Sequence, residues 1–189
     1  MKPLTSSFRD PSGFVFSYNE KVYRQINKCF ANEFDSFISS GLCSALIEKG
    51  LLISHEDVDT PDIPRTGNCH RIILPEQIPY ISYPYEWSFE QLKDAAIHHL
   101  DFHLFLLNND ANLIDASAYN IQFEGTKPKF IDILSIKKYV DGEFWAAHKQ
   151  FCENFLNPLI LKSKKGIDFN NWFKGNLEGI KTSDIYSML

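Results

Sequence analysis

The stretch "LIDASAYNIQFEGTKPKFIDILS" covers residues 113–135 and decides how the chain is interpreted. Two apolar runs flank the turn-forming Gly125, so the pattern predicts a tight β-hairpin. The hairpin accounts for the apolar residues. It does not account for Asp115, Asn120 and Asp132, which stand among apolar neighbours. Asp132 lies between two isoleucines in "KFIDIL". The simplest alternative is structural, with Asp and Asn side chains capping turns.

The spacing of these three polar residues suggests a chemical role. Asn120 follows Asp115 by five residues, and Asp132 follows Asn120 by twelve. Phosphoryl transfer uses a carboxylate that receives or orients the acceptor hydroxyl, together with an amide oxygen and a second carboxylate that bind Mg²⁺. Oxygen atoms are the ligands that a hard cation prefers. The spacing therefore predicts Asp115 as the catalytic residue, and Asn120 and Asp132 as the metal ligands.

This stretch resembles the catalytic segment of the protein-kinase-like fold. "DASAYN" stands in the place of the catalytic loop, and "FID" in the place of the metal-binding aspartate. Leu113 replaces the usual His of that pattern, and Ile133-Leu134 replaces Phe-Gly. The resemblance implies an α+β, compact two-lobed protein-kinase-like fold, with a small β-rich N-terminal lobe and a helical C-terminal lobe. It also implies ATP and Mg²⁺ as cofactors.

Upstream residues supply partial matches to a nucleotide-binding lobe. "FVFS" and "VYRQI" (residues 14–17 and 22–26) predict a β-hairpin. Arg24 lies where a kinase-like strand carries Lys, and Glu33 on the following helix is its candidate partner. Ser12 and Gly13 form a thin phosphate loop with one glycine. A surface Arg and a solvated Glu are the alternative, since isolated charges are common on surfaces.

The segment "YISYPYEW" (residues 80–87) resembles a kinase hinge. The extended backbone near Tyr85 and Glu86 is the expected contact for an adenine edge. A proline-containing linker is the alternative, and the residues do not separate the two. The expected organisation is an N-lobe-like part at 1–83, a C-lobe-like part with the catalytic-type hairpin at 84–161, and a tail or connector to a following domain at 162–189.

Two long helices and several short elements are predicted from periodicity. "HRIIL" (70–74) and "IPYISY" (78–83) predict strands, and helices are expected before Gly41 and Gly50. Residues 87–110 predict a helix opened by a capping box of Ser88 and Gln91. Its expected apolar stripe is Phe89, Leu92, Ala96, Leu100, Leu104 and Leu107. Residues 143–161 predict a second helix with the stripe Phe144, His148, Phe151 and Phe155.

Two other metal sites are weaker predictions. His98, His99, Asp101 and His103 lie together on the long helix, and the last two histidines have the i, i+4 spacing of helical zinc ligands. Packing of the neighbouring leucines competes for that face. Residues 54–68 form an acidic loop that could attract a cation, but a solvated loop is the plainer interpretation.

Composition bounds the function classes. The chain has 189 residues, 44% of them hydrophobic, and a net charge of −5, which disfavours nucleic-acid binding. The four cysteines lack a CxxC pair and are expected to be reduced and mostly buried. With no apolar leader and no run of transmembrane length, the expectation is a cytoplasmic protein that does not bind membranes.

Several segments extend the resemblance over most of residues 7–161, among them "VYRQIN", "SGLCSALIEKGLLI" and "DASAYNIQFEGTKPKFIDILSI". They are similar to the N-terminal region of a bacterial family of class I S-adenosylmethionine-dependent methyltransferases. No strand here is followed by a G-x-G pattern, so methyl-transfer chemistry is not expected in these residues. The leading interpretation is ATP/Mg²⁺ binding with phosphotransfer to a small-molecule or glycan hydroxyl. The alternative is a non-catalytic domain that serves a methyltransferase domain in cis or in trans.

Overall fold

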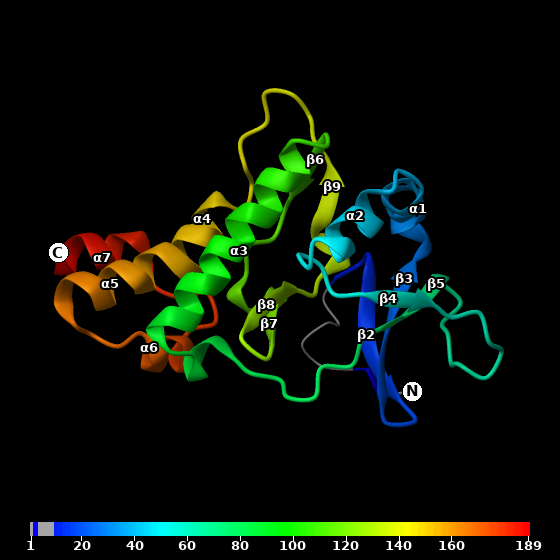
Figure 1. The fold of residues 1–189 in the computed structure, drawn as a ribbon, viewed down its shortest axis with the longest axis horizontal. Coiled ribbons are helices and arrows are strands. Elements are labelled where there is room, and N and C mark those ends of the chain that lie inside the picture. The colour runs from blue at the N-terminus through cyan, green and yellow to red at the C-terminus, as the bar shows by residue number, and fades with distance from the viewer. Residues whose placement is uncertain (1, 4–9) are drawn as a thin grey trace. The chain divides into compact units, whose positions relative to one another are not determined.

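The structure is a computed structural model that describes residues 2–3 and 10–189. The chain divides into two compact units, Met1–Pro79 and Tyr80–Leu189. The first unit is rich in strands and the second is mostly helical (Figure 1). The α+β class, with a β-rich first part followed by a helical second part, is confirmed.

The first unit is built on an antiparallel sheet with the strand order β1-β2-β3-β5-β4. Its strands are β1 (Lys2–Pro3), β2 (Gly13–Tyr18), β3 (Lys21–Asn27), β4 (His55–Asp57) and β5 (Cys69–Pro75). The predicted hairpin is confirmed as β2 and β3. Its two-residue turn places Asn19 and Glu20 at positive φ, 47° and 62°, as the right-handed strand twist favours. Phe16, Tyr23 and Ile72 form the core on this sheet.

Two helices connect β3 with β4. They are α1 (Ala31–Ser39) and α2 (Leu42–Glu48), and α1 is preceded by a 3₁₀ turn, Lys28–Phe30. Gly41 joins them at a φ of +77°, a conformation that glycine adopts without strain. Phe34 and Phe37 of α1 and Leu46 of α2 are buried. The prediction of two helices ending near the two glycines is confirmed.

The second unit is organised around α3 (Phe89–Leu107). The predicted capping box is present, because Ser88 Oγ accepts a hydrogen bond from the Gln91 N–H at 3.2 Å and Gln91 Oε1 accepts one from the Ser88 N–H at 2.9 Å. The predicted apolar stripe is wrong for half of its members. The buried face of the helix consists of Leu92, Ala95, Ala96, His98, His99, Phe102, His103 and Leu106.

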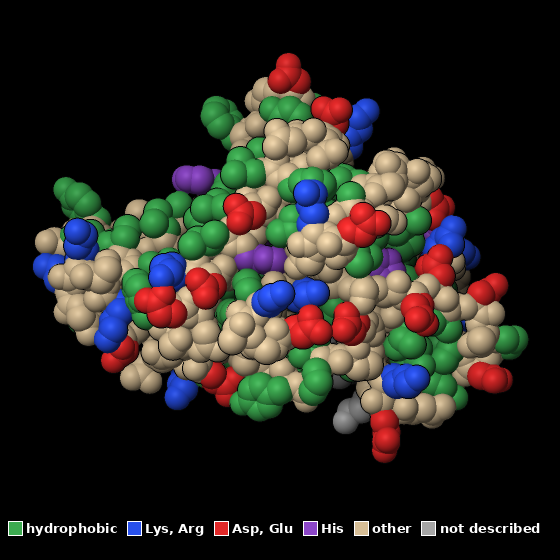
Figure 2. All heavy atoms as spheres, in the orientation of Figure 1, with side chains coloured by type: hydrophobic (Ala, Val, Ile, Leu, Met, Phe, Trp, Pro, Cys, Tyr) green, Lys and Arg blue, Asp and Glu red, His purple; other side chains and the backbone are tan. Residues whose placement is uncertain are grey.

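The opposite face of α3 leaves a second apolar row at the surface. Ile97, Leu100, Leu104 and Leu107 recur at helical spacing, and between 36% and 56% of each residue is exposed. Figure 2 shows hydrophobic side chains at the surface over this helix. Because α3 is apolar on two faces, its periodicity does not identify the face that packs inward.

Four short strands follow α3. β6 (Ala111–Leu113) pairs with β9 (Ile136–Lys138), and β7 (Ile121–Glu124) pairs with β8 (Lys127–Phe130). Gly125 closes the β7–β8 hairpin at a φ of +61°, which confirms the predicted turn. Two 3₁₀ turns, Ala118–Asn120 and Ile133–Ser135, flank the hairpin.

The second predicted helix begins later than expected. It consists of α4 (His148–Phe151), a π-helical segment (Cys152–Leu156) and α5 (Asn157–Lys165). Phe144 lies outside the helix and is 96% exposed, and His148 is exposed as well, so the predicted stripe is wrong at both positions. The chain then forms α6 (Asn170–Gly175) and α7 (Thr182–Met188), whose surroundings bury Phe169, Phe173, Ile180 and Ile185.

Two further expectations are corrected. Residues 78–83 form no strand and lead into a 3₁₀ turn, Pro84–Glu86. The N–H groups of Ser82 and Tyr83 donate hydrogen bonds to the side chains of Gln122 and Glu86 and not to a neighbouring strand. All four cysteines are free, but only Cys43 is buried. In the part of the chain that the structure describes, no helix has the length and apolarity to cross a membrane.

Candidate catalytic site

The loop that carries Asp115 is shaped by side chains bonded to its own backbone. Asp115 lies two residues after β6, and its Oδ1 accepts a hydrogen bond from the Ser117 N–H at 2.8 Å. Ser117 Oγ accepts one from the Tyr119 N–H at 3.2 Å, and the Asn120 N–H donates to the Ser117 carbonyl at 3.1 Å. These turns are typical of Asp and Ser before a backbone reversal. They place Asp115 and Asn120 at the two ends of one compact loop.

The β7–β8 hairpin returns the chain to this loop. The Ile131 N–H donates to the Asn120 carbonyl at 2.9 Å, directly before Asp132. The Ser135 hydroxyl donates a short hydrogen bond to the Asp132 carboxylate. The Ile114 N–H in turn donates to the Ser135 carbonyl at 2.9 Å, directly before Asp115. The two segments that carry the aspartates are therefore joined at both ends.

The groups around Asp115 shift the pKa of its carboxyl group. Burial raises the pKa of Asp115, and the negative charge of Asp132 raises it further. The hydrogen bond from the Ser117 N–H lowers that pKa, and the side-chain amides of Gln150 and Asn120 close by lower it as well. All three predicted residues of the opening stretch therefore lie in one neighbourhood of the second unit. The Asn120 Nδ2 is buried and makes no hydrogen bond of ordinary geometry, which marks a polar group without its usual partner.

The donor set fits Mg²⁺ rather than zinc. Within residues 2–3 and 10–189, no group of three or more His, Cys, Asp or Glu side chains is arranged to hold a metal ion. Magnesium needs fewer protein ligands, because it is bound through one or two carboxylates, waters and substrate phosphates. Asp132 and the amide oxygen of Asn120, beside Asp115, supply oxygen ligands of that kind.

The predicted residues of the first unit lie in ordinary structural positions. Arg24 is buried in β3, in register with Val15 on one side and Ile73 on the other. Glu33 is exposed in the first turn of α1. Ser12 accepts a hydrogen bond from the Asn27 N–H at 2.8 Å, and Gly13 is the first residue of β2.

Sequence reasoning missed a charged cluster that ties α1 to β5. Asp35 accepts hydrogen bonds from His70 Nε2 at 3.0 Å and from Arg71 Nε at 3.1 Å. Hydrogen bonding by His70 is the largest cause that lowers the pKa of Asp35, and Arg71 adds to it. The sequence signal was only an acid on a helix and bases on a strand, which any solvated surface shows.

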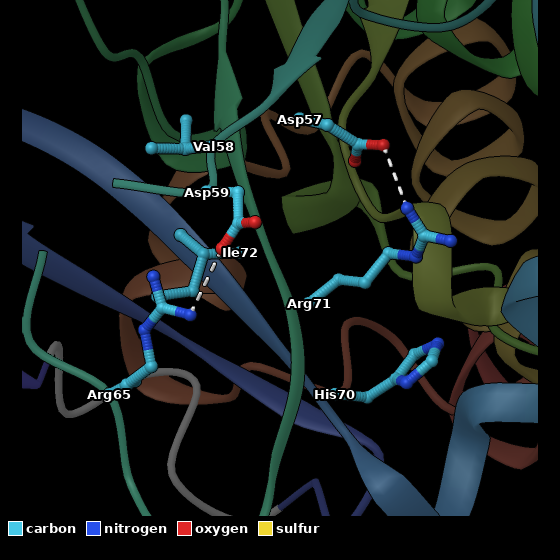
Figure 3. Close-up of a pocket in the computed structure, with 7 residues that line it drawn as sticks. All are labelled: Asp57, Val58, Asp59, Arg65, His70, Arg71 and Ile72. Atoms are coloured by element: carbon cyan, nitrogen blue, oxygen red, sulfur yellow. Dashed lines mark hydrogen bonds and ion pairs between the residues drawn. The ribbon is translucent and has the colours of Figure 1, made fainter. Parts of the chain in front are cut away.

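Arg71 also borders a cavity of about 260 Å³ in the first unit (Figure 3). Its wall is made by Asp57, Val58, Asp59, Arg65, His70, Arg71 and Ile72. Arg71 pairs with Asp57 at 3.1 Å, and Arg65 pairs with Asp59 at 3.4 Å. Two of the four acids of the predicted acidic loop, Asp57 and Asp59, are thus paired with arginines, which disfavours a cation site there.

The hinge-like segment uses its polar backbone internally. The Glu86 carboxylate accepts a hydrogen bond from the Tyr83 N–H at 2.8 Å. Asn170 Nδ2 donates to the carbonyls of Tyr85 and Trp87, each at 3.0 Å. The rings of Tyr83 and Tyr85 stack at 5.4 Å. The segment is therefore a fixed turn, not the extended strip expected for adenine binding.

The histidines of α3 have a packing role. His99 is fully buried among Phe130, Phe151 and Phe155, with ring centroids 5.4–5.9 Å away. Burial is the main cause that lowers the pKa of His99 to about 3. His103 stacks on Trp145 at 4.2 Å. Since the described residues offer no metal-binding group here, the zinc interpretation has no support.

The chain is similar in sequence to part of a longer known protein. No protein-family profile matches it. Nodulation protein NoeA of Rhizobium meliloti (strain 1021) is 43% identical over 188 residues, which are 98% of this chain and 39% of NoeA. The chain thus spans about 39% of the length of that curated relative. Among solved structures, vaccinia related kinase 3 matches 99% of this chain and 69% of its own, with 14% identity and a TM-score of 0.48.

Proposed function

We propose that this chain binds ATP with Mg²⁺ and transfers a phosphoryl group to a hydroxyl of a small molecule or glycan. One observation carries the proposal: the β7–β8 hairpin brings Asp132 back beside Asp115 and Asn120. The order of these groups along the chain, and their chemistry, are those that kinase-type phosphoryl transfer requires.

Each residue has a distinct proposed role. Asp132 and the Asn120 amide oxygen would hold Mg²⁺, which neutralises phosphate charge when bound. Asp115 would accept the proton of the acceptor hydroxyl. The hydroxyl oxygen bonds to the γ-phosphorus as the bond to the bridging oxygen breaks, and that electron pair leaves with ADP.

The remaining roles belong to residues that lie apart along the chain. Arg24 is the proposed phosphate contact, with Glu33 as its orienting partner and Ser12 and Gly13 as the phosphate turn. Tyr85 and Glu86 are the proposed adenine contacts. Because the turn at Pro84–Glu86 occupies its backbone groups internally, recognition there would use the tyrosine rings, whose faces stack on flat bases.

Isothermal titration of the intact chain with ATP tests the function. Heat of binding is expected with Mg²⁺ and should fall sharply with excess EDTA. An NMR or colorimetric assay for ADP release then measures turnover. Absence of binding at millimolar ATP and Mg²⁺, with the protein folded by circular dichroism, would overturn the proposal.

A second candidate is a non-catalytic domain of a longer protein, such as one with S-adenosylmethionine-dependent methyl transfer. It is favoured by the length of NoeA, of which this chain spans 39%. The same titration with S-adenosylmethionine, and with ATP lacking Mg²⁺, separates the candidates. A folded chain that binds no nucleotide supports the accessory role.

A further inference from the structure

The exposed apolar row of α3 has the spacing of residues that contact a second helix. Ile97, Leu100, Leu104 and Leu107 follow one another at intervals of three, four and three residues. This alternation keeps one stripe of a helix facing a partner helix over successive turns. The opposite face of α3 is buried in the second unit. The row is therefore separate from the core of that unit and is free in its spacing to pack against another helix.

Aromatic residues extend this apolar surface along one edge of the row. His103 lies one helical turn from both Leu100 and Leu107, and Trp145 stacks on its ring with centroids 4.2 Å apart. The Nε1 of Trp145 also donates a hydrogen bond to a carbonyl of β6 at 2.8 Å. These contacts hold the neighbouring Phe144 beside the helix, although its side chain is exposed. An aromatic ring kept in solvent next to an apolar row is typical of a surface that binds another protein.

The other edge of the row is acidic. Asp94 and Asp101 are exposed, and each lies one helical turn from Ile97. Lys93, the cation nearest to Asp94 in the sequence, forms its ion pair with Glu90. The two aspartates therefore present negative charge along that edge. Lysine or arginine residues at the facing positions of a partner would complement this charge.

We propose that α3 binds a basic amphipathic helix of a partner protein. The apolar residues of that helix would cover the exposed row, and its lysine or arginine residues would lie beside Asp94 and Asp101. Helices recognised in this way present apolar residues at positions i, i+3, i+4 and i+7. The proposal concerns a surface that the proposed phosphoryl transfer does not use.

A second copy of this chain has the wrong charge for this surface. In an antiparallel two-fold pair the same edge of each helix meets. Asp94 of one copy would then face Asp101 of the other, and such like-charge contacts are costly. In a parallel pair the aspartates would meet the aromatic edge instead of lysine or arginine. An anionic membrane is disfavoured as well, because helices that lie on such membranes carry lysine and arginine beside their apolar face.

Two synthetic peptides test the chemistry of the partner. Each is a fluorescein-labelled amphipathic helix of ~21 residues, long enough to be helical in water, with leucines at alternating intervals of three and four. One carries lysine on both edges of the leucine stripe, and the other carries glutamate. The peptides are kept at nanomolar concentration, so that they do not associate with themselves. Fluorescence anisotropy with the full chain should show that the lysine peptide binds at least about 10-fold more tightly than the glutamate peptide.

Variants of α3 locate the binding surface. Leu104→Gln removes an exposed apolar side chain from the middle of the row and should weaken binding of the lysine peptide at least about 10-fold. The double variant Asp94→Lys/Asp101→Lys should reverse the preference, so that the glutamate peptide binds more tightly. Circular dichroism checks that both proteins are folded.

Controls match each change elsewhere on the surface. Leu177→Gln alters an exposed leucine outside α3, and Glu48→Lys/Asp62→Lys gives the same change of net charge at exposed positions of the first unit. Both controls should bind the peptides as the parent does. Failure of the folded parent to bind the lysine peptide at ~100 µM protein overturns the proposal, and so do losses in the controls that equal those in the α3 variants.

Two further measurements test the other occupants of the row. Light scattering after gel filtration should show a monomer; a dimer that Leu104→Gln dissociates would assign the row to a second copy of this chain. Sedimentation with phosphatidylserine-containing vesicles should show no binding of the protein; binding that Leu104→Gln removes would assign the row to a membrane surface. Either of these results overturns the assignment to a basic partner helix.

Discussion

At the scale of single residues, two aspartates share one neighbourhood but differ in their partners. Asp115 is bonded to a backbone amide and lies close to two side-chain amides, whereas Asp132 accepts a hydrogen bond from a serine hydroxyl. Such differences allow neighbouring acids to take different roles. The proposed roles of Asp115 as base and Asp132 as metal ligand, which were predicted from spacing, are compatible with these surroundings.

Substitution of these acids should separate their roles. Asp132→Asn keeps the shape but removes a ligand charge, so Mg²⁺-dependent ATP affinity should fall at least about 10-fold by calorimetry. Asp115→Asn should leave ATP affinity near the parent value and reduce turnover about 100-fold or more. If both variants match the parent in nucleotide assays and differ only in stability, the aspartates are structural.

Buried His99 should make stability depend on pH. Burial lowers the pKa of His99 from 6.5 to about 3 in the folded state. Above pH 6.5 the ring is neutral in both the folded and the unfolded chain, so the buried ring does not reduce the free energy of unfolding. As pH falls from 6.5 towards 3, His99 becomes protonated in the unfolded chain but stays neutral in the folded chain. The free energy of unfolding should then fall by up to about 1.4 kcal/mol per pH unit.

Urea denaturation at pH 7, 6, 5 and 4 measures this dependence. His99→Leu has a similar volume and no titrating ring, so its curve should be flatter over the same range. His148→Leu, an exposed position, should keep the slope of the parent. Parallel curves for His99→Leu and the parent would show that other groups cause the acid sensitivity.

At the scale of elements, the π-helical segment and the chain after α6 depend on a glycine. Gly179 has a φ of +80°, and a Cβ there would lie 2.2 Å from the Glu153 carbonyl oxygen. The same carbonyl accepts a hydrogen bond from the Ile180 N–H at 2.9 Å. The backbone approaches the helix so closely that no side chain fits.

Gly179→Ala should therefore destabilise the protein by about 3 kcal/mol or more, from strain at positive φ and a backbone clash. Gly142→Ala is the matched control, because Gly142 has a φ of +82° and open space around it. That variant should lose only the conformational part, about 1–2 kcal/mol. Chemical denaturation measures the free energy of unfolding of both variants. Equal losses of stability would show that the backbone clash at Gly179 has no cost of its own.

Elements with local signals were predictable, and those decided by distant partners were not. The Ser88–Gln91 capping box and the turn at Gly125 depend on residues a few positions apart. The inward face of α3 depends on Phe130 and Phe155, which supply the aromatic surroundings of His99. For the candidate site, spacing predicted that Asp115, Asn120 and Asp132 act together. Gln150 and Asn154 are ordinary amides in the sequence, and only the fold brings their side-chain oxygens to the Ala116 and Ala118 N–H groups of the loop.

At the scale of the whole molecule, residues 162–189 contribute to the core of the second unit. If they were a connector to another domain, their removal would leave that unit unchanged. Truncation after Lys165 removes the buried Phe169, Phe173 and Ile180, so the second unit should lose cooperative unfolding. Truncation after Ser187 removes Met188 and Leu189, of which Leu189 is 57% exposed, and should have little effect. Thermal circular dichroism and amide NMR spectra compare the two.

The hydrogen bonds of Asn170 have a consequence for the order in which the protein is made. They connect this side chain to the carbonyls of Tyr85 and Trp87, the former 85 residues earlier. At a synthesis rate of about 5–20 residues per second, Asn170 is made on the order of ten seconds after the turn at Tyr85 that it stabilises. The last strand of the sheet in the first unit ends at Pro75, so that sheet does not need residues that are made so much later. During translation the first unit can fold early, while the aromatic side chains of the second unit stay unburied until α6 has been synthesised.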